Sequence, residues 1–495
     1  MHSLKFSSPS LPTSSKRRQR ILSRRTSILV FILLVVAASI IYLGFRCTRE
    51  FLSTSSVPFH LINQDDDADY WDWETLSHFT PEVKTENNDK IFYSNQADDD
   101  DDLCNTFPSY LLSRIQVVLK LGSSEPADRL HTHTATVTRC ISNLIIVSDR
   151  ESEDHHIHDV LATYPPSFWV DLTDYETYKA LQLGNGKPVD GTKGWNLDRF
   201  KFLPMVEHAY RINPAAEWFI FLETDTYVFW DNVFRLLDHY DPQTSLYFGS
   251  PAPGRMDGDR QTYFAYGGSG FILSVSAVKK LLKREVGLYG QYKQPSVAMQ
   301  FADLTKGDCC GDSVLGWALH QKGIELSGLW PMFNAHALHG IPFDEVHWCQ
   351  PVISLHKTQL ADMNALIKFE NQRNRTYPLL YADLMDFLKL GTFAEKVDWD
   401  NGDWGGFQER PESPAHSSFS ACRTACHDHP QCLSYTYDSS GHCIFVRAIR
   451  LGSEKVNPPE SRLSAGWDAE KIKDWQARHR CEKPMWVKPS LKRIF

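Results

Sequence analysis

The segment that most constrains the fold is Trp218–Trp230, which reads Trp-Phe-Ile-Phe-Leu-Glu-Thr-Asp-Thr-Tyr-Val-Phe-Trp. Its unbroken apolar start is typical of a strand that is buried on both faces of a parallel sheet. Because residues i and i+2 of an extended chain point the same way, Glu223 and Asp225 are expected to present two carboxylates together at the end of this strand. Ligands bind at that end of open α/β sheets, so a divalent cation between the two carboxylates is one interpretation, and a strand that ends in a polar turn is the alternative.

Two further apolar runs predict strands before this segment. Ile115–Lys120 and Asn143–Ser148 are expected to be buried strands, with a helix around Ala127–Thr138 between them. Strand, helix and strand at this spacing indicate a βαβ unit and a parallel sheet. Helical spacing of apolar residues also predicts one helix over Gly194–Tyr210, leading into the central strand. The globular part is expected to begin near Tyr110.

The composition indicates an oxidising compartment and argues against nucleic acid as a partner. The net charge of −9 gives no reason to expect nucleic acid as a partner. Five of the 11 cysteines fall between Cys422 and Cys481. This density indicates disulfides and an oxidising compartment, and the irregular spacing disfavours the competing zinc site.

The N-terminal part predicts a membrane anchor. Residues 1–27 are rich in Lys and Arg and are expected to be a cytosolic tail, ahead of an uncharged run at 28–45. That run is about 18 residues long, at the short end of what crosses a bilayer, and no cleavage site follows it. We interpret it as a transmembrane signal-anchor, with a cleaved signal peptide as the alternative. Positive charge before the span keeps that side cytosolic, so an acidic stem at 46–109 and all that follows would be lumenal. The sequon at Asn374 then predicts N-glycosylation.

The segment Tyr227–Gly249, together with the residues before it, resembles the fringe and core-1 galactosyltransferase group of nucleotide-sugar glycosyltransferases (family 31). That group carries Asp-Asp-Asp-Thr-Tyr-Val as its metal-binding segment. The resemblance implies that Asp225 binds manganese and that Thr224 lies at the nucleotide-sugar. Glu223 and Thr224 depart from the pattern, and Glu223 is expected to contact the metal, a metal-bound water or the ribose.

Three later segments resemble the same family in the same order. Tyr266–Ser274 resembles Gly-Gly-Ala-Gly-Tyr-Val-Leu-Ser, which implies a sugar-binding loop at the glycines. Asp312 follows Gly311 where the family has Glu-Asp, and the resemblance implies that it is the catalytic base; its position also predicts a helix N-cap. His356 ends a segment that resembles Val-Ser-Phe-His and is expected to bind the metal, which favours Mn²⁺ because Mg²⁺ prefers oxygen ligands. The loop glycines are Gly267, Gly268 and Gly270.

The resemblance also implies a fold and further contacts. It predicts a GT-A-type, Rossmann-like mixed sheet with helices on both faces over residues 110–396. It places the uridine near the turn after the first strand, which makes Lys120 and Gly122 candidate contacts. A snorkelling lysine and a turn glycine are the alternatives. Lys201 matches a family lysine and is expected either to face the diphosphate or to be a solvated helix residue.

Residues 397–495 predict a second, small domain. The run from Cys422 to Cys443 resembles a PAN/apple module, a disulfide-rich α+β domain. That pattern implies the pairs Cys422–Cys443 and Cys426–Cys432, and leaves Cys481 to close the ends of the module. Such modules bind protein or carbohydrate. The partners of the other cysteines stay open; these are Cys104, Cys140, Cys309, Cys310 and Cys349.

Together these features predict an inverting type II membrane glycosyltransferase of the Golgi or endoplasmic reticulum. It would move a hexose from a UDP-sugar to a glycan or glycoprotein hydroxyl with manganese, and the resemblance favours galactose in a β1,3 linkage. The departures at Glu223, Thr224 and Gly311 motivate an alternative, a carbohydrate-binding or scaffold protein with a degenerate transferase domain. A metal-dependent glycoside hydrolase is a second enzymatic alternative.

Overall fold

A computed structural model describes residues 70–71, 102–153, 156–183, 191–392, 394–402 and 406–493. By its internal contacts the chain divides into the units Met1–Asp66 and Asp67–Phe495, and every described residue belongs to the second. The predicted basic tail and the predicted span at 28–45 lie outside the described residues. Within the described ranges, no helix combines the length and apolar character needed to cross a membrane.

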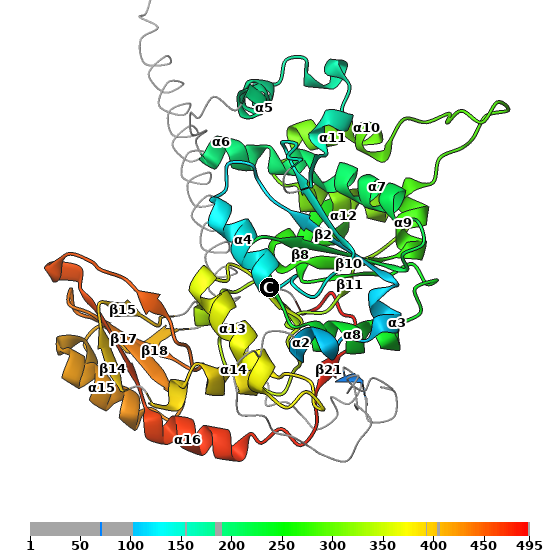
Figure 1. The fold of residues 1–495 in the computed structure, drawn as a ribbon. Helices are drawn as coiled ribbons and strands as arrows, with labels where there is room; N and C mark the ends of the chain where they lie inside the picture. Colours follow the sequence, from blue (N-terminus) through cyan, green and yellow to red (C-terminus); the bar gives the residue numbers. More distant parts are fainter. Residues whose placement is uncertain are drawn as a thin grey trace, which may run out of the picture. The chain divides into compact units, whose positions relative to one another are not determined.

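A seven-stranded mixed sheet forms the centre of the described unit (Figure 1). Its strands lie in the order β11-β7-β10-β5-β2-β3-β4, and β5 is the predicted central strand. β2 pairs in parallel with both β3 and β5, as the sequence predicts, while β10 runs antiparallel between β5 and β7. The bounds are β2 Ile115–Lys120, β3 Leu144–Ser148, β4 Ile157–Asp159, β5 Trp218–Glu223, β7 Tyr247–Gly249, β10 Phe271–Ser274 and β11 Ser327–Gly328.

Helices cover both faces of this sheet because alternate strand residues point to opposite sides. Ile220 and Leu222 of β5 pack into a cluster with residues of α8, α13 and α14. Phe219 and Phe221 pack on the other face with residues of α7, α9 and α12. The helix bounds are α4 Ala127–Ala135, α7 Phe202–Ile212, α8 Trp230–His239, α9 Val275–Leu282, α12 Gly311–Gln321, α13 Leu360–Gln372 and α14 Tyr381–Phe387.

The single helix predicted over Gly194–Tyr210 is wrong. The chain forms α6 (Gly191–Asn196), a 3-10 turn (Asp198–Phe200) and then α7. Pro204 accounts for the break, because proline has no N–H to bond the carbonyl four residues earlier and is tolerated only in the first turn of a helix. The helix therefore restarts at Phe202, which places Pro204 in that first turn.

A small three-stranded sheet follows the central strand and joins distant parts of the chain. β6 (Tyr227–Val228) pairs antiparallel with β13 (Ser354–Leu355), which also pairs with β12 (Phe333–Asn334). Leu355 lies opposite Tyr227 in this register. The residues just before β6 therefore lie beside the residues just after β13, and these are Asp225 and His356.

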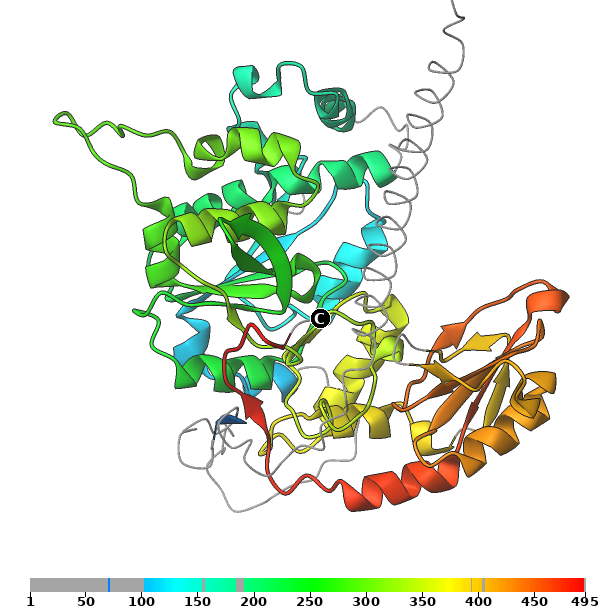
Figure 2. The same cartoon turned by 180° about the vertical axis from the view of Figure 1, so that it is seen from behind.

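The globular unit begins earlier than the predicted Tyr110. α2 (Asp102–Asn105) carries Leu103, which is buried in the same cluster as α8, and Cys104 forms a disulfide with Cys140. Within the predicted stem, β1 (Tyr70–Trp71) pairs with the C-terminal strand β21 (Trp486–Val487) (Figure 2). The expected stem boundary at residue 109 is thus too late, because Tyr70 and Trp71 pack against the large core cluster and Leu103 is buried in it.

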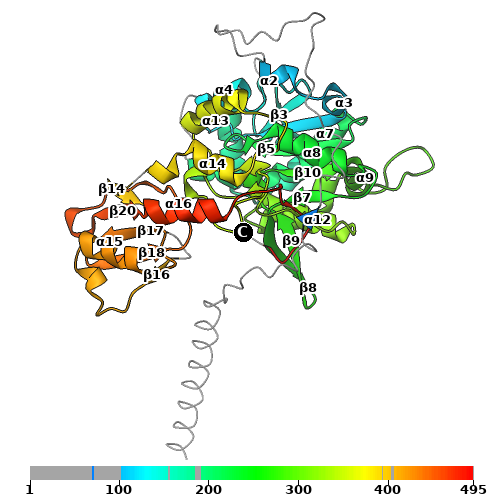
Figure 3. The ribbon, with the colours of Figure 1, turned by 90° about the horizontal axis from the view of Figure 1, so that it is seen from below.

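The C-terminal module is built on a five-stranded antiparallel sheet in the order β14-β20-β17-β18-β16. Its first strand starts at Glu395, slightly before the expected boundary at 397. α15 (Phe419–Asp428) lies on β17 and β18 (Figure 3). Disulfides join Cys422 to Cys443 and Cys426 to Cys432, the two pairs that the resemblance implies. The strand bounds are β14 Glu395–Val397, β16 Phe407–Gln408, β17 Ser434–Asp438, β18 His442–Val446 and β20 Leu463–Trp467.

Cys481 does not close the ends of this module. It forms a disulfide with Cys349, which lies just before β13. After α16 (Ala469–Arg478) the chain leaves the module and returns to the large sheet, where Ser490 donates its N–H to the carbonyl of Gly328. The predicted module and tail over 397–495 thus include a last segment that contacts the large sheet.

Candidate active site

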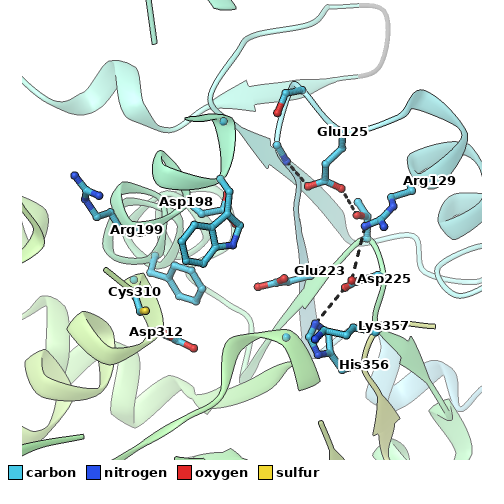
Figure 4. Close-up of a pocket in the computed structure, with 18 of the residues that line it drawn as sticks. Glu125, Arg129, Asp198, Arg199, Glu223, Asp225, Cys310, Asp312, His356 and Lys357 are labelled. Carbon is cyan, nitrogen blue, oxygen red and sulfur yellow. Dashed lines mark hydrogen bonds and ion pairs between the residues drawn. The ribbon is translucent and has the colours of Figure 1, made fainter. Parts of the chain in front are cut away.

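The acidic pair and the imidazole that the sequence singled out lie together at the C-terminal end of β5. One donor atom each from Glu223, Asp225 and His356 lies within 4.8 Å of the other two (Figure 4). The Nε2 atom of His356 is 3.6 Å from Oδ1 of Asp225. That Oδ1 atom is buried and has no hydrogen-bond partner among the described residues. A buried carboxylate oxygen without a donor is costly to leave bare, so the cluster is suited to a cation.

Backbone pairing fixes these side chains. Thr358 donates its N–H to the carbonyl of Asp225 at 2.9 Å, which continues the pairing of β6 with β13. The hydroxyl of Thr226 donates to the carbonyl of Gly268 at 2.8 Å. A Cβ atom on Gly268 would lie 2.3 Å from Nε2 of His356, so only glycine leaves room for the ring. The predicted glycine loop therefore shapes the cation cluster itself.

The donor set fits Mn²⁺ on its chemistry. Two carboxylates and one imidazole combine oxygen and nitrogen ligands, whereas Mg²⁺ and Ca²⁺ are held by oxygen ligands. Asp225 and His356 would be direct ligands of such an ion. Glu223 also lies 3.2 Å from Nζ of Lys120, so its charge is shared between the cluster and a buried lysine.

Asp312 lies across the pocket from the cluster, on the first turn of α12 (Figure 4). Its Oδ2 atom accepts the N–H of Gly267 at 2.8 Å, and its Oδ1 atom accepts the N–H of Ser313 at 2.8 Å. Burial raises the pKa of this carboxyl to about 6, against the lowering effect of those two hydrogen bonds. Asp312 is not the N-cap that its position predicted, because α12 begins at Gly311 and Cys310 caps it.

The loss of the acidic residue before Asp312 has a steric cause. A Cβ atom on Gly311 would lie 2.3 Å from Cδ2 of Phe202 and 2.8 Å from the carbonyl of Arg199. No side chain fits there, because Phe202 occupies the space beside Asp312. A glycine at position 311 therefore fits the close packing against Phe202 of α7. The carboxyl of the next residue, Asp312, lines the pocket.

Lys201 is not the solvated helix residue that was one of its two expected roles. Its side chain is fully buried, and its Nζ atom lies 2.9 Å from Oδ2 of Asp149 and 2.7 Å from Oδ1 of Asp198. It also donates to the carbonyl of Leu121. A lysine between two carboxylates is held as an ion pair, and Lys201 is neither solvated nor among the residues that line the pocket.

Lys120 lies beneath the site and does not line it. Its Nζ atom is 2.5 Å from Oδ2 of Asp198 and 3.2 Å from Oε1 of Glu223. Burial lowers the pKa of Lys120, but the carboxylates of Asp198 and Glu223 raise it well above its ordinary range. Alternating charges thus run from Asp149 through Lys201, Asp198 and Lys120 to Glu223.

Gly122 and Thr224 line the pocket, as expected of nucleotide-sugar contacts. Glu125, which sequence reasoning missed, connects them: it accepts the N–H of Gly122 at 2.7 Å and the hydroxyl of Thr224 at 2.5 Å. Gly267 and Gly270 do not line the pocket. Instead, the N–H of Gly267 donates a hydrogen bond to Asp312. Gly270 adopts a positive φ of 74° where it packs against the end of β5.

The pocket between the cluster and Asp312 has a volume of about 590 Å³. Arg129 of α4 and Lys357 line the pocket on the side of Glu223, Asp225 and His356. Nη1 of Arg129 is 3.7 Å from Oδ2 of Asp225. Sequence reasoning missed both cations, although Lys357 directly follows His356. It also missed Trp195, Phe202 and Tyr266. Burial and the site carboxylates raise the pKa of Tyr266 to about 12, so its hydroxyl stays protonated.

Cys309 and Cys310, adjacent in sequence, form a disulfide in the wall of this pocket. The carboxylate of Asp308 accepts the N–H of Cys310 at 3.0 Å and pairs with Arg255 at 2.5 Å. The loop that leads into Asp312 is thereby fixed on both sides.

Comparisons with known proteins agree with this arrangement. A family model described as "Fringe-like" matches residues 172–374, the range that holds Asp225, Asp312 and His356. The part of the chain that holds these three residues is therefore similar to a fringe-like domain.

Among curated proteins the chain is similar to "Glycoprotein-N-acetylgalactosamine 3-beta-galactosyltransferase 1" of Xenopus laevis, with 30% identity over 116 residues. The match covers 23% of this chain and 29% of that relative. A solved structure, the "crystal structure of a glycosyltransferase involved in the glycosylation of the major capsid of PBCV-1", is 11% identical and covers 51% of this chain and 98% of its own. Its TM-score of 0.24 is too low to establish a shared fold.

Proposed function

We propose that this protein is an inverting, manganese-dependent glycosyltransferase that moves a hexose from a UDP-sugar to a hydroxyl of a glycan or glycoprotein. Galactose in a β1,3 linkage is the favoured transfer, since a galactosyltransferase is named among the similar proteins. The enzyme would be a type II membrane protein of the Golgi or endoplasmic reticulum, anchored by residues 28–45. Asn374 lies exposed in a loop and is a suitable glycosylation acceptor.

One observation carries this proposal: a cation cluster and a carboxyl of raised pKa face each other across one pocket. Asp225, Glu223 and His356 stand on one side, and Asp312 stands on the other. These segments are far apart in the sequence and meet only through the pairing of β6 with β13 and the glycine turn beside Asp312. A pocket of about 590 Å³ has room for a ligand of the size of a nucleotide-sugar.

The side of the pocket at the cluster suits a departing diphosphate. As the bond between the sugar and the diphosphate breaks, negative charge grows on the leaving oxygen, and fixed cations nearby stabilise it. Manganese bound by Asp225 and His356 would supply Lewis-acid stabilisation of that charge. Arg129 and Lys357 add positive charge from the protein on the same side.

The opposite side suits activation of the acceptor. Asp312 takes the proton of the acceptor hydroxyl while that oxygen attacks the anomeric carbon. A pKa of about 6 leaves the carboxyl ionised near neutral pH and makes it a better base than an ordinary aspartate. A single attack from the face opposite the diphosphate inverts the anomeric configuration.

The C-terminal module is proposed to be PAN/apple-like and to bind protein or carbohydrate. Its helix α15 and two disulfides support this reading, since both cysteines of the helix bridge to the sheet region. The disulfide between Cys349 and Cys481 attaches the C-terminal part to the unit that also holds Asp225 and Asp312.

The experiment that tests the proposed function is UDP release from the purified full chain with Mn²⁺ over a panel of UDP-sugars. We expect release from one or a few donors, with the galactose donor first. Absence of release from every donor would leave a carbohydrate-binding or scaffold protein as the better account. Hydrolysis of glycosides without any nucleotide donor would instead favour a glycoside hydrolase.

A further inference from the structure

The pocket has two chemically different sides. Asp225, His356, Arg129 and Lys357 lie on one side, with Glu223 between the sides (Figure 4). Arg199, Cys310 and Asp312 lie on the other, and the same pocket is lined by apolar groups. These apolar groups are Trp195, Phe202 and the disulfide between Cys309 and Cys310.

Trp195 of α6 lines the pocket but is 59% exposed. An indole this open carries a large apolar area that a ligand can cover, and its flat face accommodates a ring. Its ring is therefore available to a ligand in the pocket, whereas Phe202, which also lines the pocket, is buried against Gly311.

The disulfide between Cys309 and Cys310 forms a second apolar surface. A disulfide has no hydrogen-bond donor, and sulfur is polarisable, so it packs well against C–H groups. Asp308 fixes its backbone, and the hydroxyl of Ser313 donates to the same carboxylate at 3.2 Å. The surface is therefore rigid and stands only two residues before Asp312.

We propose that Trp195 and the Cys309–Cys310 disulfide form the acceptor subsite, and that its ligand is a hexopyranose ring which presents a C–H face to them. This inference rests on the proposed function. The ring lies with one hydroxyl at Asp312; the new bond joins that oxygen to the anomeric carbon of the donor. The bond from that carbon to the diphosphate breaks, its electron pair leaves with UDP, and the proton goes to Asp312.

The charges of the lining residues indicate which side of the pocket binds the donor and which binds the acceptor. The donor carries a negatively charged diphosphate. Arg129, Lys357 and a metal ion bound by Asp225 would supply the positive charge that binds it. On the apolar side the one cation among the lining residues is Arg199, whose Nη2 atom is 2.7 Å from Oδ2 of Asp174. An uncharged ring with one apolar face and several hydroxyls fits that side, because pockets combine apolar lining with a few directing polar groups.

The test measures UDP release by the full chain with its preferred UDP-sugar, with and without methyl α- and β-glycosides of galactose, N-acetylgalactosamine, glucose, N-acetylglucosamine and mannose. We expect at least one glycoside to stimulate release. Trp195→Ala should raise the KM for that glycoside about tenfold, which corresponds to about 1.4 kcal/mol. The KM of this variant for the UDP-sugar should stay within about twofold of the wild-type value. An unchanged KM for the donor also shows that the donor site is folded in the variant.

Matched variants separate the subsite from general damage. Trp195→Phe should recover most of the affinity for the glycoside, because it restores a flat apolar ring. Tyr289→Ala removes an aromatic side chain that is 93% exposed and does not line the pocket, and should change neither KM. The double variant Cys309→Ser/Cys310→Ser should raise the KM for the glycoside in the same way as Trp195→Ala.

Each remaining result decides against the subsite or against the whole function. If no donor releases UDP, the proposed function itself fails. If UDP is released but no glycoside stimulates release, the hexopyranose assignment is overturned while transfer to another acceptor survives. An unchanged KM for the glycoside in both Trp195→Ala and the double cysteine variant also overturns it.

Discussion

At the scale of single residues, two carboxylates of one pocket are given different tasks by their surroundings. Asp225 lies beside an imidazole and an arginine and forms part of the cluster that is suited to a cation. Asp312 is buried, and the resulting rise of its pKa to about 6 suits it to accept a proton.

Asp312→Asn should retain UDP-sugar binding and lower the transfer rate about 10²- to 10⁴-fold, because the amide cannot accept the proton. In the wild type, the ionised carboxylate is the active form. We therefore expect the logarithm of kcat/KM to fall with decreasing pH through about 6, with a slope approaching one. Steady-state kinetics between pH 5 and about 8 check both points. Transfer at the wild-type rate by the Asn variant would remove Asp312 from the reaction.

The sequence singles out three residues that line one pocket, but it misses several of their neighbours there. Asp225, Asp312 and His356 end or begin apolar segments, where a polar residue stands out. Lys201 stands out equally, yet its partner Asp149 comes from a distant segment of the chain, so its burial could not be inferred. Arg129 and Trp195 carry no local signal, because a cation or an aromatic residue on a helix is usually surface or core.

At the scale of elements, the contact between β6 and α13 stabilises the turn that carries Asp225. The hydroxyl of Tyr227 donates to Oε2 of Glu370 at 2.6 Å, inside the core. Burial raises the pKa of Glu370 to about 7, although Arg373 and the hydroxyl of Tyr227 lower it. A buried glutamate held partly neutral makes the stability of this contact depend on pH.

Glu370→Gln should reveal that dependence. The pKa of Glu370 is raised from 4.5 to about 7, so its stabilising contribution is fully present below pH 4.5 and is lost as pH rises through 7. The Gln side chain does not titrate and can still accept from Tyr227. The variant should therefore gain about 3 kcal/mol relative to wild type between pH 4.5 and pH 8. Urea unfolding at both pH values measures this, and a difference that is independent of pH would contradict it.

Element prediction succeeded where apolar runs are long and failed where pairing is short. β2, β3 and β5 agree with the predicted strands to within a residue or so. β6 and β13 have two residues each, too few for any periodicity, and yet they bring Asp225 to His356. The resemblance between segments, which carries information from many residues, supplied what the local pattern could not.

At the scale of the molecule, the C-terminal part does not stand apart from the transferase part. The disulfide Cys349–Cys481 joins residues that are 132 positions apart in the sequence. Next to it, the indoles of Trp348 and Trp475 pack edge to face with their ring centroids 4.8 Å apart. Phe343 and Ile449 also exchange backbone hydrogen bonds. Pairing across such distances depends on the final fold, so the cysteine spacing alone suggested a closed module.

Cys349→Ala/Cys481→Ala should lower the free energy of unfolding by about 2–5 kcal/mol, because the bridge closes a long loop. Cys426→Ala/Cys432→Ala is the matched control, since it removes a bridge between residues only 6 apart and should cost less on entropic grounds. Urea unfolding followed by tryptophan fluorescence compares them. An equal or larger loss in the control would show that loop length does not govern these bridges.

The most direct test of the account is a manganese titration of UDP release by the full chain after removal of bound metal with EDTA. We predict no release without metal, a saturable rise with Mn²⁺, and loss of that rise in both Asp225→Ala and His356→Ala. UDP release by the metal-free wild type at the full rate, or an unchanged manganese response in both variants, would contradict the shared cation site.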